Sequence, residues 1–211
     1  MTLPSPFTKI YTLPFPKPQL NLRATLLCGQ SFRWKSLSDT HFLGVIGKSI
    51  LYLNQDDEHT LTASVYPEAP EEHVKTLLED YFQMKFDLEA MKKTWCQNQC
   101  EQYREMQFDF RRALAWVGSL RLIRQDPWEC LMCFICSQNN NIKRITLMVD
   151  RLCRSYGDFI GKSEGMEFFA FPTLEQMEDV TEDELRELGF GYRAKYIVKV
   201  VKQVFFEELA N

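Results

Sequence analysis

The sequence has no long apolar run, because no stretch approaches the roughly 20 consecutive apolar residues that a membrane span requires. It also lacks a basic start followed by an apolar block, the pattern of a secretory signal. Its seven cysteines are an odd number, which argues against complete internal pairing. We therefore predict a chain with no membrane partner, whose cysteines are thiols in a reducing compartment.

Residue patterns that bind metals are also few. Three cysteines follow each other at the spacing of some metal and iron–sulfur sites, but they alternate with apolar residues in a predicted helix. Spacings of three spread side chains around a helix, and Cys153 is distant in the sequence. The pattern favours buried thiols, and we expect no metal and no cofactor. The three cysteines of this helix are Cys130, Cys133 and Cys136. The histidines His41, His59 and His73 form no cluster in the sequence.

The net charge of −4 weighs mildly against nucleic-acid binding, so the distribution of charge matters more. Residues 111–163 carry nine basic and four acidic side chains, and residues 188–202 carry four basic and no acidic ones. The segment between them, residues 164–187, carries nine acidic side chains and one basic. Contact with phosphate requires only a locally basic face. Fluctuations of this size also occur in ordinary acidic proteins, so charge alone leaves the question open.

The N-terminal part reads as an extended arm followed by a sheet. Five prolines within residues 1–18 exclude a helix and predict the arm. Short apolar or alternating runs, separated by turn residues, predict an antiparallel sheet of hairpins with strands at 19–27, 31–35, 41–46, 50–53 and 61–66. From about residue 70 the apolar spacing becomes helical, and Asp87 is placed to cap a short helix through Trp95.

Nearly all of the sequence after residue 108 has helical spacing. Pro127 fits the first turn of one helix, and Gly157 fits the end of the next. The final helix has a full apolar stripe that only the preceding helices can cover. Two pairs fit capping boxes, Thr173 with Gln176 and Thr181 with Glu184. We therefore predict an α+β chain, with a proline-rich arm over 1–18, an antiparallel-sheet domain with covering helices over 19–107, and the first part of a helical domain over 108–211.

Three segments carry a resemblance to a known family. They are Gly29-Gln30-Ser31-Phe32-Arg33-Trp34, the stretch from Arg124-Gln125-Asp126-Pro127 to Asn139-Asn140-Asn141-Ile142-Lys143-Arg144-Ile145-Thr146, and Leu188-Gly189-Phe190-Gly191-Tyr192-Arg193-Ala194-Lys195-Tyr196. In order and spacing they closely resemble eukaryotic 8-oxoguanine DNA glycosylases, and the resemblance runs from about Leu20 to about Gln203. It implies a TATA-binding-protein-like N-terminal half and a glycosylase domain that is incomplete in this chain.

The resemblance gives Gly29 the task of telling the lesion from guanine. Oxidation turns N7 of guanine from a hydrogen-bond acceptor into a donor, so a fixed carbonyl facing N7 gains a bond with the lesion and repels guanine. By resemblance, the Gly29 carbonyl plays this part, and the missing Cβ lets the base approach the main chain. Taken alone, Gly29 also fits a plain hairpin turn.

The resemblance also assigns the contacts to the opposite base. Asn139, Arg144 and Arg193 would hold the orphaned cytosine, whose acceptors at N3 and O2 and donor at N4 suit two arginines and one asparagine. Tyr192 would wedge the duplex open. By pattern alone, the arginines fit a solvated helix face, the asparagines a loop, and Tyr192 a contact with Phe190. Lys195 and Lys199 are candidate contacts to the DNA backbone.

The resembled family cleaves with a lysine nucleophile and an aspartate that follow a hairpin of the form Leu-Pro-Gly-Val-Gly. The 211 residues contain no such hairpin, and Lys195, Lys199 and Lys202 match no catalytic position. We therefore expect a base-excision repair glycosylase/AP lyase by family, truncated before its catalytic residues and inactive alone. Its expected partner is double-stranded DNA containing 8-oxoguanine opposite cytosine, bound by a monomer in the nucleus, with the mitochondrion as a second location. The alternatives are a non-enzymatic or inhibitory DNA-damage-binding module and an unstable truncation product.

Overall fold

The computed structural model describes residues 3–97 and 110–209. Its N-terminal part is built on a five-stranded antiparallel sheet of strand order β1-β5-β4-β3-β2. The strands are β1 (Tyr11–Leu13), β2 (Lys35–Ser36), β3 (His41–Ile46), β4 (Ser49–Asn54) and β5 (Leu61–Tyr66). The prediction of an α+β chain with an N-terminal antiparallel sheet is confirmed, and the strands expected at 41–46, 50–53 and 61–66 are present.

Two expected strands are wrong or much shorter than predicted. Residues 19–27 contain helix α1 (Leu22–Leu26), because the Asn21 side chain caps a helix start by accepting a hydrogen bond from the backbone N of Ala24 at 2.9 Å. Residues 31–35 contribute only Lys35 to a strand. The remainder of that segment is loop.

The proline-rich arm does not lie apart from the sheet. Its residues 11–13 form edge strand β1, which pairs with β5, and Phe7, Tyr11, Leu13 and Phe15 are buried. Proline lacks the backbone donor that a central strand needs, so a strand bordered by prolines is tolerated at a sheet edge.

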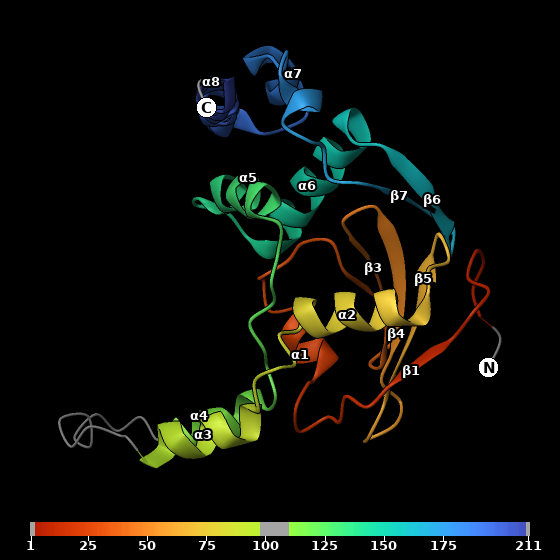
Figure 1. Cartoon of the computed structure of the whole chain (residues 1–211). Coiled ribbons are helices and arrows are strands. Elements are labelled where there is room, and N and C mark those ends of the chain that lie inside the picture. Colours follow the sequence, from red (N-terminus) through yellow and green to blue (C-terminus); the bar gives the residue numbers. More distant parts are fainter. Residues whose placement is uncertain (1–2, 98–109, 210–211) are drawn as a thin grey trace.

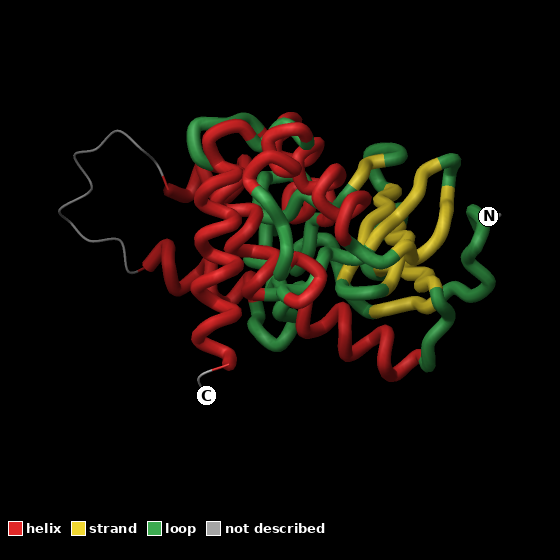
Figure 2. Tube along the Cα trace, turned by 90° about the horizontal axis from the view of Figure 1, so that it is seen from above, coloured by secondary structure: helices red, strands yellow, loops and turns green. Residues whose placement is uncertain are grey.

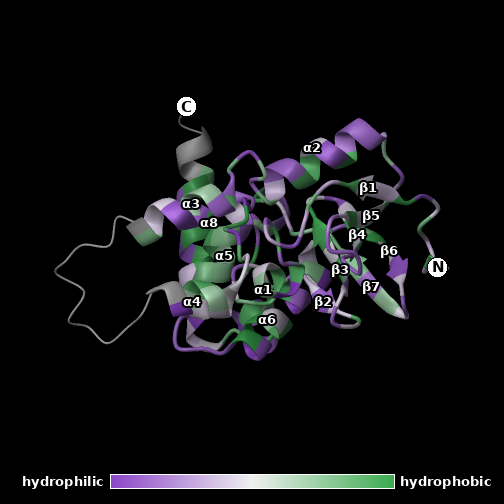
Figure 3. Cartoon of the chain, turned by 90° about the horizontal axis from the view of Figure 1, so that it is seen from below, coloured by the Kyte–Doolittle hydropathy of each residue, from purple (hydrophilic) through white to green (hydrophobic). Residues whose placement is uncertain are grey.

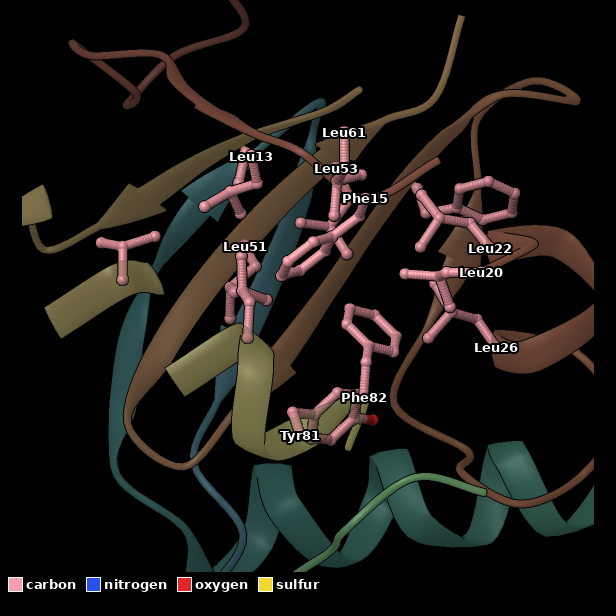
Figure 4. Packing of buried hydrophobic residues seen from close by; sticks show 14 of the residues in the cluster. Leu13, Phe15, Leu20, Leu22, Leu26, Leu51, Leu53, Leu61, Tyr81 and Phe82 are labelled. Atoms are coloured by element: carbon pink, nitrogen blue, oxygen red, sulfur yellow. The ribbon is translucent and has the colours of Figure 1, made fainter. Parts of the chain in front are cut away.

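Helix α2 (Glu71–Tyr81) lies across the sheet and closes the first core (Figure 1). The sheet, α1 and the end of α2 contribute side chains that are almost fully enclosed, as the close view in Figure 4 shows for Leu13, Leu51, Leu53 and Phe82 among others. Burial of this many apolar side chains is the main stabilising contribution in a fold of this size.

The helical part begins with α3 (Leu88–Gln97) and α4 (Phe110–Val117), which lie side by side away from the sheet. The predicted domain boundary near residue 108 lies outside the described residues. Helices α5 (Pro127–Ser137), α6 (Ile142–Tyr156), α7 (Glu182–Glu187) and α8 (Ala194–Leu209) follow, with 3-10 turns at Glu175–Met177 and Gly191–Arg193. Figure 2 shows how these helices gather on one side of the molecule and the strands on the other.

The predicted helix ends are confirmed. Asp87 Oδ1 accepts from the backbone N of Ala90 at 3.1 Å, Pro127 starts α5 and Gly157 ends α6. Both capping boxes form, because each threonine hydroxyl accepts from the backbone N three residues on while the partner side chain accepts from the threonine N. Their partners are Gln176 for Thr173 and Glu184 for Thr181.

The expectation of an almost wholly helical second part is wrong at residues 159–169, where β6 (Phe159–Ser163) and β7 (Met166–Phe169) form a hairpin. Glu164 and Gly165 link the strands with φ of 50° and 70°. Two consecutive positive φ values match the twist of a two-residue hairpin turn. The hairpin packs against the N-terminal sheet, where Phe168 joins Phe7, Leu43, Val45 and Ile50 in a separate core.

The stripe of the final helix is covered by the helices before it. Ile197 and Val201 are buried, and α8 contacts both α5 and α7. Figure 3 shows hydrophobic residues concentrated on α5, α6 and α8 where these helices lie together. Over the described ranges, no helix combines the length and the apolar character needed to cross a bilayer.

Candidate nucleic-acid interface

The turn between α5 and α6 is the centre of the candidate site, and its three asparagines have different structural tasks. Asn139 adopts a left-handed conformation with φ of 45°, which asparagine tolerates better than most residues. Asn140 donates to the carbonyl of Cys136 at 2.8 Å and so satisfies the end of α5. Asn141 Oδ1 accepts from the backbone N of Arg144 at 3.0 Å and caps α6. The Asn139 side chain is left exposed at the tip of the turn.

Arg144 lies in the first turn of α6, and its side chain is exposed. The cap made by Asn141 fixes where α6 begins, and therefore fixes where this guanidinium leaves the helix. Its neighbour Lys143 is also exposed, so two cations stand directly beside the asparagine turn.

Tyr192 and Arg193, far along the sequence, contact the same turn. The Tyr192 hydroxyl donates to the carbonyl of Gln138 at 3.1 Å. Arg193 Nη2 also donates to the Gln138 carbonyl, and it lies 3.2 Å from the carbonyl oxygen of Asn139. The Gln138 carbonyl is therefore shared by two side chains that the sequence analysis had grouped with this turn only through the family resemblance. No sequence pattern identifies a backbone acceptor of this kind.

Arg193 is enclosed although it is charged. It is only 2% exposed, its guanidinium lies 4.6 Å from the centre of the Tyr192 ring, and its Nε is buried without a hydrogen-bond partner. No ion pair to Arg193 is present among the described residues. A buried cation held by carbonyls and one aromatic face is unusual, because burying a charge without a counter-ion costs free energy.

The Tyr192 ring stays accessible. It is 45% exposed and meets the ring of Tyr196 edge-on, with centroids 6.4 Å apart. Phe190, the alternative partner in the sequence analysis, is fully buried in the helical core. An exposed ring at the end of a tight turn has the form that a wedge between bases requires.

Gly29 lies opposite the start of α6. Its φ is +91°, and a Cβ added to it would lie 3.3 Å from Cδ1 of Ile142. A groove of about 720 Å³ separates the Gly29 loop from the asparagine turn, with Phe32 and Lys143 also in its walls. Ile142, which is half exposed, was not among the predicted site residues, and its contact with Gly29 follows from tertiary packing alone.

The residues after Gly29 tie its loop to both parts of the molecule. Trp34 Nε1 donates to the Tyr81 hydroxyl at 2.8 Å, and burial raises the pKa of Tyr81 to about 12. Arg33 donates through Nη1 to Cys153 Sγ at 2.7 Å on α6 and through Nη2 to the carbonyl of Phe169 on β7. The loop is thus fixed between the sheet side and the helix side.

The predicted backbone contacts lie next to the site. Lys195 and Lys199 are exposed one turn apart on α8, directly after Arg193. Lys195 Nζ lies 5.0 Å from the centre of the Tyr196 ring. Tyr192 and Arg193 therefore contact the turn that carries Asn139, and Arg144 follows that turn on α6. Of the predicted residues, Gly29 lines the groove beside the turn, whereas Lys195 and Lys199 lie further along α8.

The cysteines differ in part from the prediction. Cys133, Cys136 and Cys153 are buried, whereas Cys130 is exposed. Cys153 is distant from the other cysteines in sequence only. It lies on α6, in the same hydrophobic core as Cys133 of α5. Burial raises the pKa of all three buried thiols, to about 12 for Cys136 and Cys153. Within the described part of the chain, no group of three or more His, Cys, Asp or Glu residues could hold a metal ion.

The site combines two kinds of interaction that nucleic acids accept. Its exposed cations suit phosphate oxygens, and its exposed ring suits stacking against a base. At Gly29 the wall of the groove is formed by backbone atoms, because glycine has no side chain.

Comparison with known proteins supports a relation to DNA repair enzymes. Residues 12–131 match the family of the 8-oxoguanine DNA glycosylase N-terminal domain, and residues 132–205 match the HhH-GPD superfamily base excision DNA repair proteins. The chain is 36% identical over 199 residues to the N-glycosylase/DNA lyase of Saccharomyces cerevisiae, covering 89% of this chain and 50% of that protein. It is 34% identical over 194 residues to the N-glycosylase/DNA lyase OGG1 of Arabidopsis thaliana, covering 92% and 51%.

A solved structure described as MBOgg1 in complex with a low affinity DNA ligand has the same fold. The TM-score is 0.81 at 25% identity, covering 98% of this chain and 66% of that one. The chain spans about half the length of the curated relatives it matches.

Proposed function

Because this chain belongs to the 8-oxoguanine DNA glycosylase family, we propose that it acts in base-excision repair by recognising 8-oxoguanine opposite cytosine in double-stranded DNA, as a monomer. One observation carries the proposal. The turn between α5 and α6 brings Asn139 and Arg144 together with Tyr192 and Arg193, and the groove beside that turn is walled by Gly29.

The groove suits an extruded base because one of its walls is glycine. Gly29 lines the groove, and its carbonyl can accept from the N7–H that only the oxidised purine carries, with no side chain of its own to hinder the base. Guanine presents a lone pair at N7, so neither its N7 nor the Gly29 carbonyl oxygen would have a donor. Such a loss of pairing in a desolvated site costs about 1–3 kcal/mol.

The opposite base would be held by the exposed side chains of Asn139 and Arg144 and by Arg193. In the free chain the Arg193 guanidinium binds carbonyl oxygens of Gln138 and Asn139. Cytosine also presents acceptors, at N3 and O2, so it can take the place of these carbonyls. Adenine has a single acceptor on that edge, N1, beside its amino group, so it offers the guanidinium fewer acceptors than cytosine does.

Tyr192 would fill the space left by the extruded base, and Lys195 and Lys199 would contact phosphates. We further propose that this chain binds and does not cleave. A lysine nucleophile is commonly enclosed in an apolar pocket, whereas Lys195 and Lys199 are exposed on the surface of α8. The second candidate function, a DNA-damage-binding module without chemistry, is favoured by this same observation.

The experiment is a binding titration of the 211-residue chain with labelled duplexes that differ in one base pair. The expected order of affinity is 8-oxoguanine:cytosine, then 8-oxoguanine:adenine, then guanine:cytosine. Arg144→Ala should remove most of the preference for cytosine. Lys162→Ala is the control, because Lys162 is an exposed cation on the β6–β7 hairpin, paired with Glu167. Equal affinity for all three duplexes would refute lesion recognition.

A second measurement tests the chemistry. Borohydride should trap no covalent adduct between the chain and the 8-oxoguanine duplex, because trapping requires a lysine that has formed a Schiff base with the sugar. A trapped adduct would show that the chain holds a nucleophile and would exclude the binding-only function. A thermal melt without a cooperative transition would instead indicate an unstable chain.

A further inference from the structure

Gln30 follows Gly29 directly, so the two residues share one peptide unit. The carbonyl oxygen of Gly29 lies in the same plane as the backbone N of Gln30, because the peptide bond does not rotate freely. Whatever fixes Gln30 therefore also fixes the direction of the Gly29 carbonyl. This matters at Gly29 in particular, because glycine at φ of +91° has no side chain of its own to hold it in place.

The Gln30 carboxamide is bound at both of its polar atoms by one segment of main chain. Its Nε2 donates to the carbonyl of Arg121 at 2.8 Å, and its Oε1 accepts from the backbone N of Ile123 at 3.1 Å. This pairing with alternate residues resembles the pairing of a neighbouring strand. Two bonds of opposite polarity admit only one orientation of the amide.

Further contacts complete the attachment. Gln30 Nε2 lies 3.4 Å from the carbonyl oxygen of Thr25 and 3.2 Å from Cys28 Sγ. The backbone carbonyl of Gln30 accepts from Gln125 Nε2 at 2.8 Å. Side chain and main chain of Gln30 are thus both held.

The segment that holds Gln30 is itself fixed. Arg121 is 5% exposed, and its guanidinium donates to the carbonyls of Gln19, Gln83 and Phe86 at 2.5, 2.9 and 2.8 Å. Its backbone N donates to Thr25 Oγ1 at 3.2 Å on α1. The Gln30 carboxamide therefore connects the groove wall to a rigid part of the N-terminal domain.

We propose that Gln30 is a positioning residue, whose carboxamide holds the Gly29 carbonyl in the direction from which it distinguishes an oxidised purine from guanine. This inference rests on the proposed function, since it concerns the same site. Gln30 itself does not touch the base. Its effect passes through the peptide plane that it shares with Gly29.

The test uses the 211-residue chain and the ratio of its dissociation constants for guanine:cytosine and 8-oxoguanine:cytosine duplexes. Gln30→Met keeps the length of the side chain and removes both amide bonds, and should lower this ratio about tenfold, equal to about 1.4 kcal/mol. Gln30→Glu keeps the acceptor for Ile123 but places a carboxylate oxygen against the Arg121 carbonyl, and should lower it as much or more. Gln125→Met removes the other bond to Gln30 and should have a smaller effect.

Gln83→Met is the matched control. Gln83 Nε2 donates to the carbonyl of Leu122 at 2.9 Å, so this glutamine binds the same segment without a connection to Gly29. The control should retain the wild-type ratio. A role of Gln30 in stability alone would lower the melting temperature and the affinity for both duplexes without changing their ratio.

The outcomes separate the two proposals. If the wild type prefers the lesion and both Gln30 variants keep the wild-type ratio of dissociation constants, the positioning role is refuted. If only Gln30→Met fails to fold, the ratio measured for Gln30→Glu decides. If the wild type shows no preference, the proposed function fails, and hydrogen exchange of the free chain tests positioning instead. Exchange within residues 28–31 should rise in Gln30→Met and not in Gln83→Met, and equal exchange would overturn the inference.

Discussion

Replacing Gly29 with alanine tests both the conformation of the groove wall and its contact with α6. The substitution adds a single methyl group at a residue whose φ is +91°, and this methyl carbon would lie 3.3 Å from Ile142 Cδ1 and 3.6 Å from Cγ1. These two consequences differ in origin. The first is a backbone strain that any side chain would meet, and the second is a steric contact with one named neighbour.

The magnitude follows from these values. A Cβ in the left-handed region costs roughly 1–2 kcal/mol. Ile142 is 50% exposed, so its side-chain tip can move by a few tenths of an ångström, at an additional cost of at most about 1 kcal/mol. The expected loss of unfolding free energy is therefore about 2 kcal/mol. For a chain of this size, a loss of 1 kcal/mol lowers the melting temperature by about 2–4 °C, so the expected decrease is about 4–8 °C.

The assay is thermal and urea unfolding of Gly29→Ala beside two companions. Gly47→Ala is the control for backbone strain, because Gly47 has φ of +58° and nothing within 4 Å of an added Cβ. Ile142→Val removes Cδ1, so in the Gly29→Ala background it should restore part of the loss. A Gly29→Ala chain as stable as the wild type would mean that the backbone does not hold this conformation, and the account of the groove wall would be wrong.

The remaining predictions concern polar groups that are buried or half-buried. Arg193→Met should change the unfolding free energy by no more than about 1 kcal/mol, because an apolar side chain removes a buried, unpaired charge. The same variant should lose the preference for cytosine. A loss of unfolding free energy above about 3 kcal/mol would contradict the stability prediction. Burial raises the pKa of Glu129, so its stability contribution is complete below the usual glutamate pKa and falls as pH rises through the raised value. Glu129→Gln should therefore gain melting temperature relative to the wild type at pH 8 but not at pH 4, and an equal change at both pH values would refute the sign. The three buried thiols should resist maleimide labelling in the native chain while Cys28 and Cys130 react, as mass spectrometry can show, and early labelling of Cys133 would be inconsistent with its burial.

Local signals predicted the elements that local chemistry determines. Asp87 and the two capping boxes fix helix ends through hydrogen bonds that span three residues, and Pro127 favours a helix start through its fixed φ. All of these signals can be identified in the sequence. The central strands were predictable because each is a short apolar or alternating run bordered by turn residues. The strand expected at 19–27 was wrong because another local signal prevailed. The Asn21 cap starts helix α1 there, and it outweighs a weak apolar pattern.

Tertiary packing determined what the sequence could not reveal. The β6–β7 hairpin had one usable signal, the Glu164-Gly165 pair, but its place against the N-terminal sheet depends on a surface that only the folded chain presents. The site shows the same division. Its members were found through a family resemblance, whereas the burial of Arg193 under the Gln138 carbonyl follows from contacts more than fifty residues apart.

The burial of Arg193 also affects how the proposed contact with cytosine would form. An exposed arginine would bind cytosine at the cost of its own flexibility, whereas in the proposed function Arg193 would exchange two carbonyl acceptors for those of the base. The number of guanidinium bonds then changes little on binding, and the buried, unpaired Nε gives the bound state room to gain. Selectivity would arise because cytosine has two adjacent acceptors on its pairing edge, N3 and O2, that can replace the two carbonyls. A base without this pair of acceptors would leave Arg193 bound to the Gln138 and Asn139 carbonyls, as in the free chain.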